Sequence, residues 1–123
     1  MQFEPNTPIW LQVAAEIKRD IITGKAPPGS RLPSGRDMAL QYKINPNTAA
    51  RVYQELEQEG VCETRRGLGT YVAEDSEMPQ RLRMQMARDL LQTYLEGMRR
   101  LGFTPEESAR MAATEKENTH AGE

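Results

Sequence analysis

Two short helix patterns separated by a break of roughly four residues constrain this chain more than any other feature. Ser34 is a good N-cap, and the pattern after it predicts a helix over about 34–42. Asn45 followed by Pro46 is a second start signal, which predicts a helix over about 45–59. Two helices joined by so tight a turn have the geometry of a helix-turn-helix.

A further helix is predicted ahead of this pair, over about 8–23, because Thr7 and Pro8 form a start signal and apolar residues then recur along one helical face. Those residues are Trp10, Ala14, Ile17 and Ile21. Gly24 ends the pattern, and a proline-rich turn leads into a short extended piece at 30–32. We interpret Trp10 as a core residue.

A β-hairpin is predicted after the three helices. Segments 61–64 and 70–73 are strand-like, and two glycines lie in the loop 65–69 between them. The chain is therefore expected to be mostly α with a small β-hairpin. Three helices and a hairpin in this order predict a winged helix-turn-helix over residues 6–76, whose third helix enters a DNA major groove. The acidic, proline-containing linker at 74–79 ends this domain.

The rest of the chain predicts a short two-helix dimerisation segment at 79–116. Its apolar residues are spaced 3, 4, 3, 4 and 3 along a helix at about 80–101, as in a coiled-coil seam. The seam is Met84, Ala87, Leu91, Tyr94, Met98 and Leu101, widened by Leu90 and Leu95. Because the seam is too short for a free coiled coil, we expect a small helical dimer interface. A capping box at Thr104 begins the last helix, and residues 117–123 are expected to form a disordered tail.

Composition excludes several classes of protein. Cys62 is the only cysteine and His120 the only histidine, so we expect no disulfide, no metal site and no cofactor. The sequence contains no glycine-rich nucleotide loop and no pair of carboxylates flanking a predicted cleft, which argues against an enzyme. The start of the chain does not resemble a leader, and no run approaches the roughly 18 apolar residues of a membrane span. We therefore expect a cytoplasmic protein.

Charge must be considered locally. The net charge of −2 by itself argues mildly against binding to nucleic acid. Between residues 31 and 51, however, basic side chains outnumber the single acidic one, Asp37. They are Arg31, Arg36, Lys43 and Arg51. Such a local cluster is the relevant footprint of a nucleic-acid-binding surface.

Several motifs in the same order resemble the GntR family of bacterial transcriptional regulators. They are Pro8-Ile9-Trp10-Leu11-Gln12, Gly29-Ser30-Arg31-Leu32-Pro33-Ser34-Gly35-Arg36, Asn45-Pro46-Asn47-Thr48-Ala49-Ala50-Arg51-Val52-Tyr53-Gln54-Glu55-Leu56-Glu57 and Arg65-Arg66-Gly67-Leu68-Gly69-Thr70-Tyr71-Val72. The likeness covers roughly residues 6–74. The brief C-terminal part resembles the YtrA-type subfamily, which carries a short helical dimerisation segment in place of a large effector-binding domain.

This resemblance implies a set of DNA contacts. They come from Arg36, from Asn45, Asn47, Thr48 and Arg51 at the start of the recognition helix, and from Arg66 and Gly67 at the wing tip. The charge pattern adds Arg31, Ser34 is expected to hold a phosphate, and Arg65 and Gly69 complete the expected wing surface. Arginine suits guanine and asparagine suits adenine in the major groove, whereas a narrow minor groove attracts a wing arginine.

Plainer interpretations remain open for these residues. Arg36 and Arg51 also fit solvated helix arginines, and Ser34 and Asn45 also fit ordinary caps. Cys62 is interpreted as a small buried hydrophobe, with a redox sensor as the alternative.

The leading hypothesis is a repressor that binds a double-stranded DNA operator with an inverted repeat as a homodimer. The alternative is a winged helix that binds protein, for which exposed aromatic residues would be expected on the surface. Any small-molecule effector would have to bind between domains or at the dimer interface, because the segment after the hairpin is too short to enclose a pocket by itself.

Overall fold

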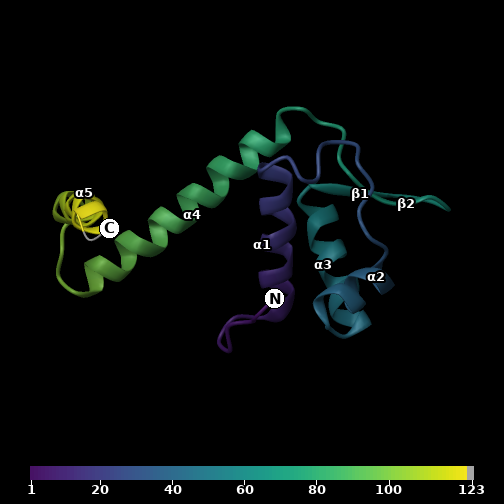
Figure 1. The fold of residues 1–123 in the computed structure, drawn as a ribbon, viewed down its shortest axis with the longest axis horizontal. Helices are drawn as coiled ribbons and strands as arrows, with labels where there is room; N and C mark the ends of the chain where they lie inside the picture. The colour runs from purple at the N-terminus through teal and green to yellow at the C-terminus, as the bar shows by residue number, and fades with distance from the viewer. Residues whose placement is uncertain (122–123) are drawn as a thin grey trace. The chain divides into compact units, whose positions relative to one another are not determined.

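The computed structural model describes the backbone of residues 1–121 and the side chains of residues 1–115. The elements are α1 (Ile9–Ile22), α2 (Gly35–Tyr42), α3 (Pro46–Gln58), β1 (Cys62–Arg65), β2 (Gly69–Val72), α4 (Met78–Arg100) and α5 (Pro105–Ala121) (Figure 1). The prediction of a mostly helical fold with one β-hairpin is confirmed. The chain divides into two compact units, residues 1–83 and the residues from 84 onward.

The core of the first unit lies between α1, α2 and α3. Both α1 and α2 pack against α3. The core residues follow the predicted helical periodicity, with the apolar face of α1 against that of α3. They include Val13, Ile17 and Ile21 from α1, Met38 from α2, and Ala49, Val52 and Leu56 from α3.

The predicted start signals of α2 and α3 are confirmed as N-caps. The Ser34 hydroxyl accepts a hydrogen bond from the Asp37 amide at 3.0 Å, and Asn45 Oδ1 accepts one from the Asn47 amide at 2.7 Å. Between the two helices, Lys43 takes the left-handed conformation with φ 55°, which is uncommon for a residue with a side chain. Its conformation makes the turn of the helix-turn-helix tight.

The predicted cap of the first helix is wrong. Pro8, not Thr7, occupies the position before Ile9, and it provides no side-chain hydrogen bond. The Gln12 side chain ties the preceding segment to the helix instead: its amide NH2 donates to the Thr7 carbonyl at 2.8 Å and to the Glu4 carbonyl at 3.0 Å, and its Oε1 accepts from the Glu4 amide at 2.8 Å. The N-terminal arm is thereby fixed over the first turn of α1.

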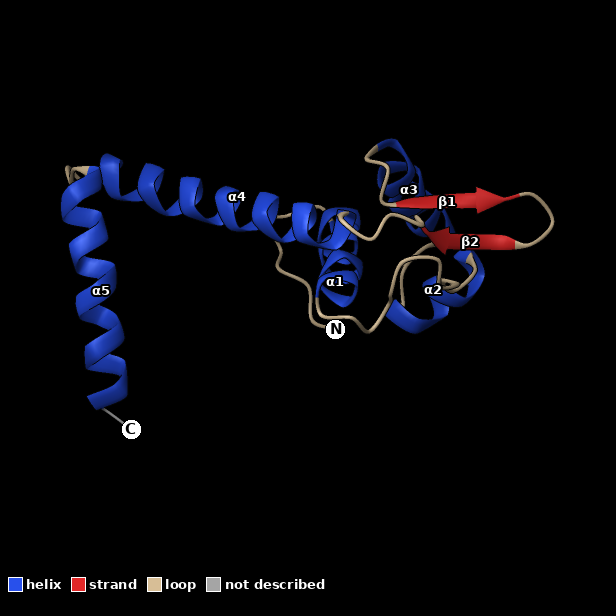
Figure 2. Ribbon diagram, turned by 90° about the horizontal axis from the view of Figure 1, so that it is seen from above, coloured by secondary structure: helices blue, strands red, loops and turns tan. Residues whose placement is uncertain are grey.

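The hairpin β1–β2 is antiparallel, and the extended piece predicted at 30–32 pairs with its second strand (Figure 2). The Leu32 amide donates to the Thr70 carbonyl, and the Val72 amide donates to the Ser30 carbonyl, each at 2.8 Å. Leu32, Cys62 and Val72 are buried in the core. Because strand side chains alternate, Glu63, Arg65 and Tyr71 occupy the opposite face of this small sheet.

The first unit extends beyond the predicted linker into α4. Met78 is buried and Leu82 packs against the same core, so the first turns of α4 belong to this unit. Asp75 begins the helix by accepting a hydrogen bond from the Glu77 amide at 3.0 Å. The Arg81 guanidinium, 2.5 Å from Asp75, is the main reason why the pKa of that carboxyl is lowered.

The second unit consists of the rest of α4 and α5, which are joined by a short turn (Figure 2). Gly102, with φ 95°, ends α4 as predicted. The Tyr94 hydroxyl donates to the Ser108 carbonyl at 2.6 Å and so ties the two helices together. Thr104 and Glu107 form the predicted capping box, with hydrogen bonds of 2.9 and 3.1 Å.

The predicted end of the last helix is too early. The helix runs to Ala121, so residues 117–121, expected in a disordered tail of residues 117–123, are helical, while residues 122–123 lie outside the described part of the chain. No helix in the part of the chain that the structure describes is long and apolar enough to cross a membrane.

Candidate nucleic-acid interface

The outer face of α3 forms one part of the candidate DNA-binding surface, and the wing forms the other. The inner face is occupied by core residues, which leaves exposed side chains along the opposite side. These are Pro46, Asn47, Ala50, Arg51 and Gln54, followed in the last turn by Glu57 and Gln58. Asn47 and Arg51 were predicted, whereas the sequence interpretation missed Ala50 and Gln54. The spacing of 3 and 4 residues from Asn47 and Ala50 would have identified both as members of this face.

A tyrosine holds the start of α2 against α3. The Tyr53 hydroxyl donates a hydrogen bond to the Pro33 carbonyl, the residue that precedes the Ser34 cap. Tyr53 is otherwise buried in the core, and desolvation raises the pKa of its phenol. This contact fixes the position of Ser34 and Arg36 relative to α3. The sequence alone does not reveal this bond, because it joins residues far apart along the chain.

Arg51 is held on the side of α3 that faces α1. Its guanidinium carbon lies 4.4 Å from the centre of the Trp10 ring, and its Nε lies 3.5 Å from Glu55 Oε1. Trp10 is half-buried and packs against the core, as predicted. It also has a second role, which is to contact the Arg51 guanidinium. The ring provides a flat surface that orients Arg51.

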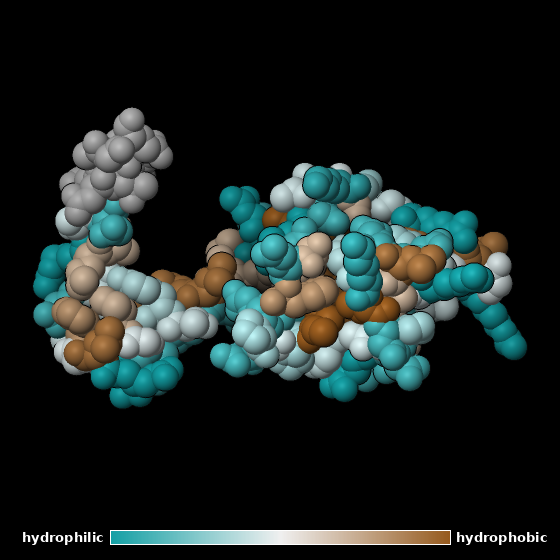
Figure 3. Space-filling view, turned by 60° about the horizontal axis from the view of Figure 1, so that its bottom comes forward, coloured by the Kyte–Doolittle hydropathy of each residue, from teal (hydrophilic) through white to brown (hydrophobic). Residues whose placement is uncertain are grey.

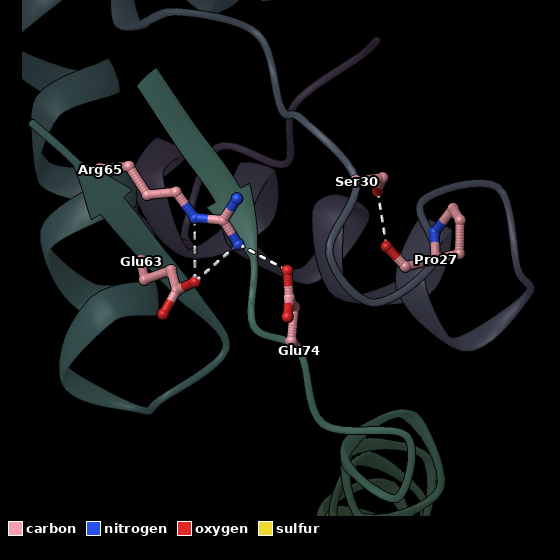
Figure 4. Close-up of polar contacts among 5 residues, drawn as sticks. All are labelled: Pro27, Ser30, Glu63, Arg65 and Glu74. Atoms are coloured by element: carbon pink, nitrogen blue, oxygen red, sulfur yellow. Dashed lines mark hydrogen bonds and ion pairs between the residues drawn. The ribbon is translucent and has the colours of Figure 1, made fainter. Parts of the chain in front are cut away.

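The two arginines of the wing have different environments, and Figure 4 shows that of Arg65. Arg65 contacts Glu63 at 3.0 Å and Glu74 at 2.9 Å, and its guanidinium lies over the Tyr71 ring. The hydrogen bond to Glu63, followed by that to Glu74, raises the pKa of Arg65. Arg66 is exposed, and the described residues provide no ion pair for it. Arg65 therefore stabilises the base of the hairpin, whereas Arg66 is available to a ligand.

The Arg31 side chain, from the extended segment that pairs with β2, lies close to Gly69. A Cβ at Gly69 would lie 3.2 Å from Arg31 Nε, and Gly69 has φ 123°, a conformation that side chains rarely adopt. The absence of a side chain at Gly69 lets the Arg31 guanidinium lie over the strand. Gly67 at the tip also has a positive φ, of 77°. Both glycines are therefore required by the backbone, whatever their role toward DNA.

The remaining predicted residues lie at the helix starts. Ser34, Arg36, Asn45 and Asn47 are exposed, and Thr48 is half-buried. Because the side-chain oxygens of Ser34 and Asn45 already serve as caps, the capping interpretation holds for both.

Cys62 has the environment of a structural residue. It is 4% exposed, and burial raises the pKa of its thiol to about 12. The reactive thiolate is therefore strongly disfavoured at neutral pH, which argues against the redox-sensor alternative.

An exposed helix face near Arg36 and Arg66, which form no ion pair with the described residues, together with a glycine-rich wing on a three-helix core, defines a winged helix-turn-helix protein of the DNA-binding class. The family model described as bacterial regulatory proteins, gntR family, matches residues 10–72. The chain belongs to the GntR family. It is therefore a DNA-binding transcriptional regulator and not an enzyme.

Two relatives and two solved structures extend this assignment. The uncharacterized HTH-type transcriptional regulator YhcF of Bacillus subtilis is 43% identical, with 86% of this chain and 88% of YhcF covered. The HTH-type transcriptional repressor YtrA of the same organism is 42% identical, with coverages of 62% and 60%.

Among solved structures, a GntR family transcriptional regulator from Listeria monocytogenes has a TM-score of 0.80 and 32% identity, with 93% of this chain and 98% of that chain covered. AraR(DBD) in complex with an operator has a TM-score of 0.54 and 27% identity, with 59% of this chain and 88% of that chain covered.

Proposed function

We propose that this regulator is a repressor that binds an inverted-repeat operator as a homodimer. The observation that carries the dimer is the composition of the second unit. Among its described side chains, residues 84–115, no apolar side chain is buried. The large apolar side chains among the exposed ones are Met84, Leu90, Leu91, Leu101 and Met111. Two helices without a core of their own are not stable in water, so a second copy is needed to cover them.

The predicted seam divides into two parts under this proposal. Met84, Ala87, Leu91 and Leu101 are exposed and available to a partner chain, whereas Tyr94 is engaged with Ser108. Leu95 and Met98 are half-buried. The first group is proposed to form the dimer contact, and the second to support the shape of the unit. A two-fold dimer then presents two equal DNA-binding units to an inverted repeat.

The proposed DNA contacts begin on α2 and α3. Arg36 and the outer face of α3 are proposed to enter the major groove, with Asn47, Arg51 and Gln54 at base edges and Arg36 at a base or phosphate. Ser34, Asn45 and Thr48 are proposed to lie next to phosphates at the positive ends of their helices.

On the wing, Arg66 is proposed to reach the minor groove, with Gly67 allowing a close approach. We propose that Arg31, Arg65 and Gly69 support the shape of the wing through contacts with other residues of the chain rather than with DNA. Repression is supported by YtrA, which is named a repressor, and operator binding by the AraR complex. We further propose a cytoplasmic location, and that any effector acts at the dimer interface.

Fluorescence anisotropy with duplexes tiled across the DNA upstream of the protein's own gene tests DNA recognition. At two salt concentrations, one duplex should bind tightly and with strong salt dependence. Arg36→Ala and Arg66→Ala should each lose about 1 kcal/mol or more of binding free energy. Lys25→Ala is the matched control, because Lys25 is exposed in the turn after α1. Equal, weak binding to all duplexes would refute specific recognition.

Sedimentation equilibrium tests the dimer. Leu91→Glu should convert the protein to a monomer, because a buried charge at the seam has no partner. Gln92→Glu places the same charge at the next exposed position of α4 and should leave the dimer intact. A Leu91→Glu protein that remains a dimer would exclude the proposed interface.

A further inference from the structure

An apolar groove lies on the outer surface between α2 and α3. It has a volume of about 510 Å³ and is lined by Leu40, Ile44, Pro46, Ala50 and Arg36, among others. Leu40 is 70% exposed although it lies within a helix of the core unit. Figure 3, which turns the lower side of Figure 1 toward the viewer, shows apolar side chains at the surface of this unit. Packing of the protein itself does not explain this exposed apolar surface.

The groove coincides with one edge of the proposed recognition surface. Pro46 and Ala50 belong both to the groove lining and to the outer face of α3. Arg36 lies at the groove and provides a positive charge for a phosphate or a guanine. Any DNA that meets the outer face of α3 therefore also meets the groove.

The side chains in the groove limit what they can recognise. Proline and alanine side chains neither donate nor accept hydrogen bonds. A polar base edge pressed against them would lose its water without gaining a partner. The 5-methyl group of thymine is the apolar feature that a base pair presents in the major groove, and alanine is a common contact for it.

We infer that this groove is a thymine subsite, in which Ala50 and Leu40 contact the 5-methyl group of one thymine in each half-site. The inference rests on the proposed function and deepens it. The outer face of α3 is then divided into two edges. The edge beside α2 reads a methyl group through Ala50, whereas Arg51, on the side of α1, and Asn47 and Gln54 between the two edges read polar base atoms.

The test replaces thymines of the operator by uracil, one at a time, and measures the dissociation constant by anisotropy. Uracil lacks only the methyl group and keeps every hydrogen-bonding atom. At one thymine in each half-site, the replacement should weaken binding about fourfold, the value for burial of one methyl-sized group. At the other thymines the ratio of the two constants should stay near one.

Variants then assign the effect to the groove. Ala50→Ser and Leu40→Ala should each bring the ratio at the sensitive thymine toward one. Gln41→Ala should leave it unchanged, since Gln41 is the exposed neighbour of Leu40 and does not line the groove. The ratio is insensitive to partial misfolding, because a smaller active fraction affects both duplexes equally.

The outcomes separate the inference from the proposed function. Tight binding to one operator without a uracil-sensitive thymine overturns the inference and leaves the repressor proposal standing. A sensitive thymine whose ratio is unaffected by both groove variants also overturns it, because the methyl group is then read elsewhere. Failure to find any specific duplex overturns the proposed function itself, and the inference with it.

Discussion

Removal of one hydroxyl group, in Tyr53→Phe, tests how the recognition helices are held together. The phenol of Tyr53 donates to the Pro33 carbonyl, and the ring is packed in the core. Phenylalanine keeps the ring and loses only the hydrogen bond. A bond of this kind contributes about 1 kcal/mol, which for a domain of this size lowers the melting temperature by about 4–8 °C.

The assay is urea and thermal unfolding followed by circular dichroism at one fixed protein concentration, because dimerisation makes the melting temperature depend on concentration. Tyr71→Phe is the control, since the described residues give its hydroxyl no hydrogen bond; its unfolding free energy should be unchanged. If the Tyr53→Phe protein is as stable as the unmodified protein, the hydrogen bond between Tyr53 and Pro33 does not stabilise the fold.

Alkaline pH gives the same prediction a second test. Burial raises the pKa of Tyr53 above its ordinary value of 10.0, so the folded state retains a proton that the unfolded state loses. The stabilisation of the folded state by the protonated phenol is fully present below pH 10, and it is lost as the pH rises further. The difference in unfolding free energy between the unmodified protein and Tyr53→Phe should therefore shrink above pH 10. A constant difference would contradict burial of the phenol.

Three further predictions concern stability. Lys43→Gly should raise the unfolding free energy by about 0.5 kcal/mol. Glycine relieves the left-handed strain at φ 55°, and this gain exceeds the additional chain entropy that glycine loses on folding. A lower urea midpoint for Lys43→Gly would contradict this prediction. Ser34→Ala should lower it by about 1 kcal/mol through loss of the cap on the Asp37 amide, whereas no change would mean that the cap adds nothing. The Cys62 thiol, whose pKa is raised from 9.0 to about 12, stabilises the fold below pH 9 and loses this effect as pH rises toward 12. Between those values the unfolding free energy should fall more steeply in the unmodified protein than in Cys62→Ala, by up to about 1.4 kcal/mol per pH unit, and equal slopes would contradict the burial.

Local signals were sufficient to predict most of the fold. The caps at Ser34 and Asn45 and the stop at Gly102 each depend on residues a few positions apart, so the sequence contains all of their partners. The end of α5 was placed too early, and residues 117–121 were expected in a disordered tail although they are helical. Polarity alone does not end a helix, and no glycine or proline occurs between Pro105 and Ala121.

The contacts that sequence reasoning missed join distant parts of the chain. Arg65 is engaged by Glu74, which belongs to the predicted linker and reaches the hairpin only after strand pairing. Arg51 lies over Trp10 because α1 and α3 pack together. The family motifs identify these arginines by their position in the sequence. Only the fold shows which arginine is paired with carboxylates, as Arg65 is, and which is exposed, as Arg66 is.

Hydroxyl-radical footprinting of the regulator on its operator tests the central proposal most directly. A homodimer with α3 in the major groove and Arg66 in the minor groove should protect two patches related by two-fold symmetry, with centres about 10 base pairs or a multiple of that apart. In Arg66→Ala, protection should be lost selectively in the minor groove. A single patch, or uniform weak protection along the duplex, would contradict dimeric recognition of an inverted repeat.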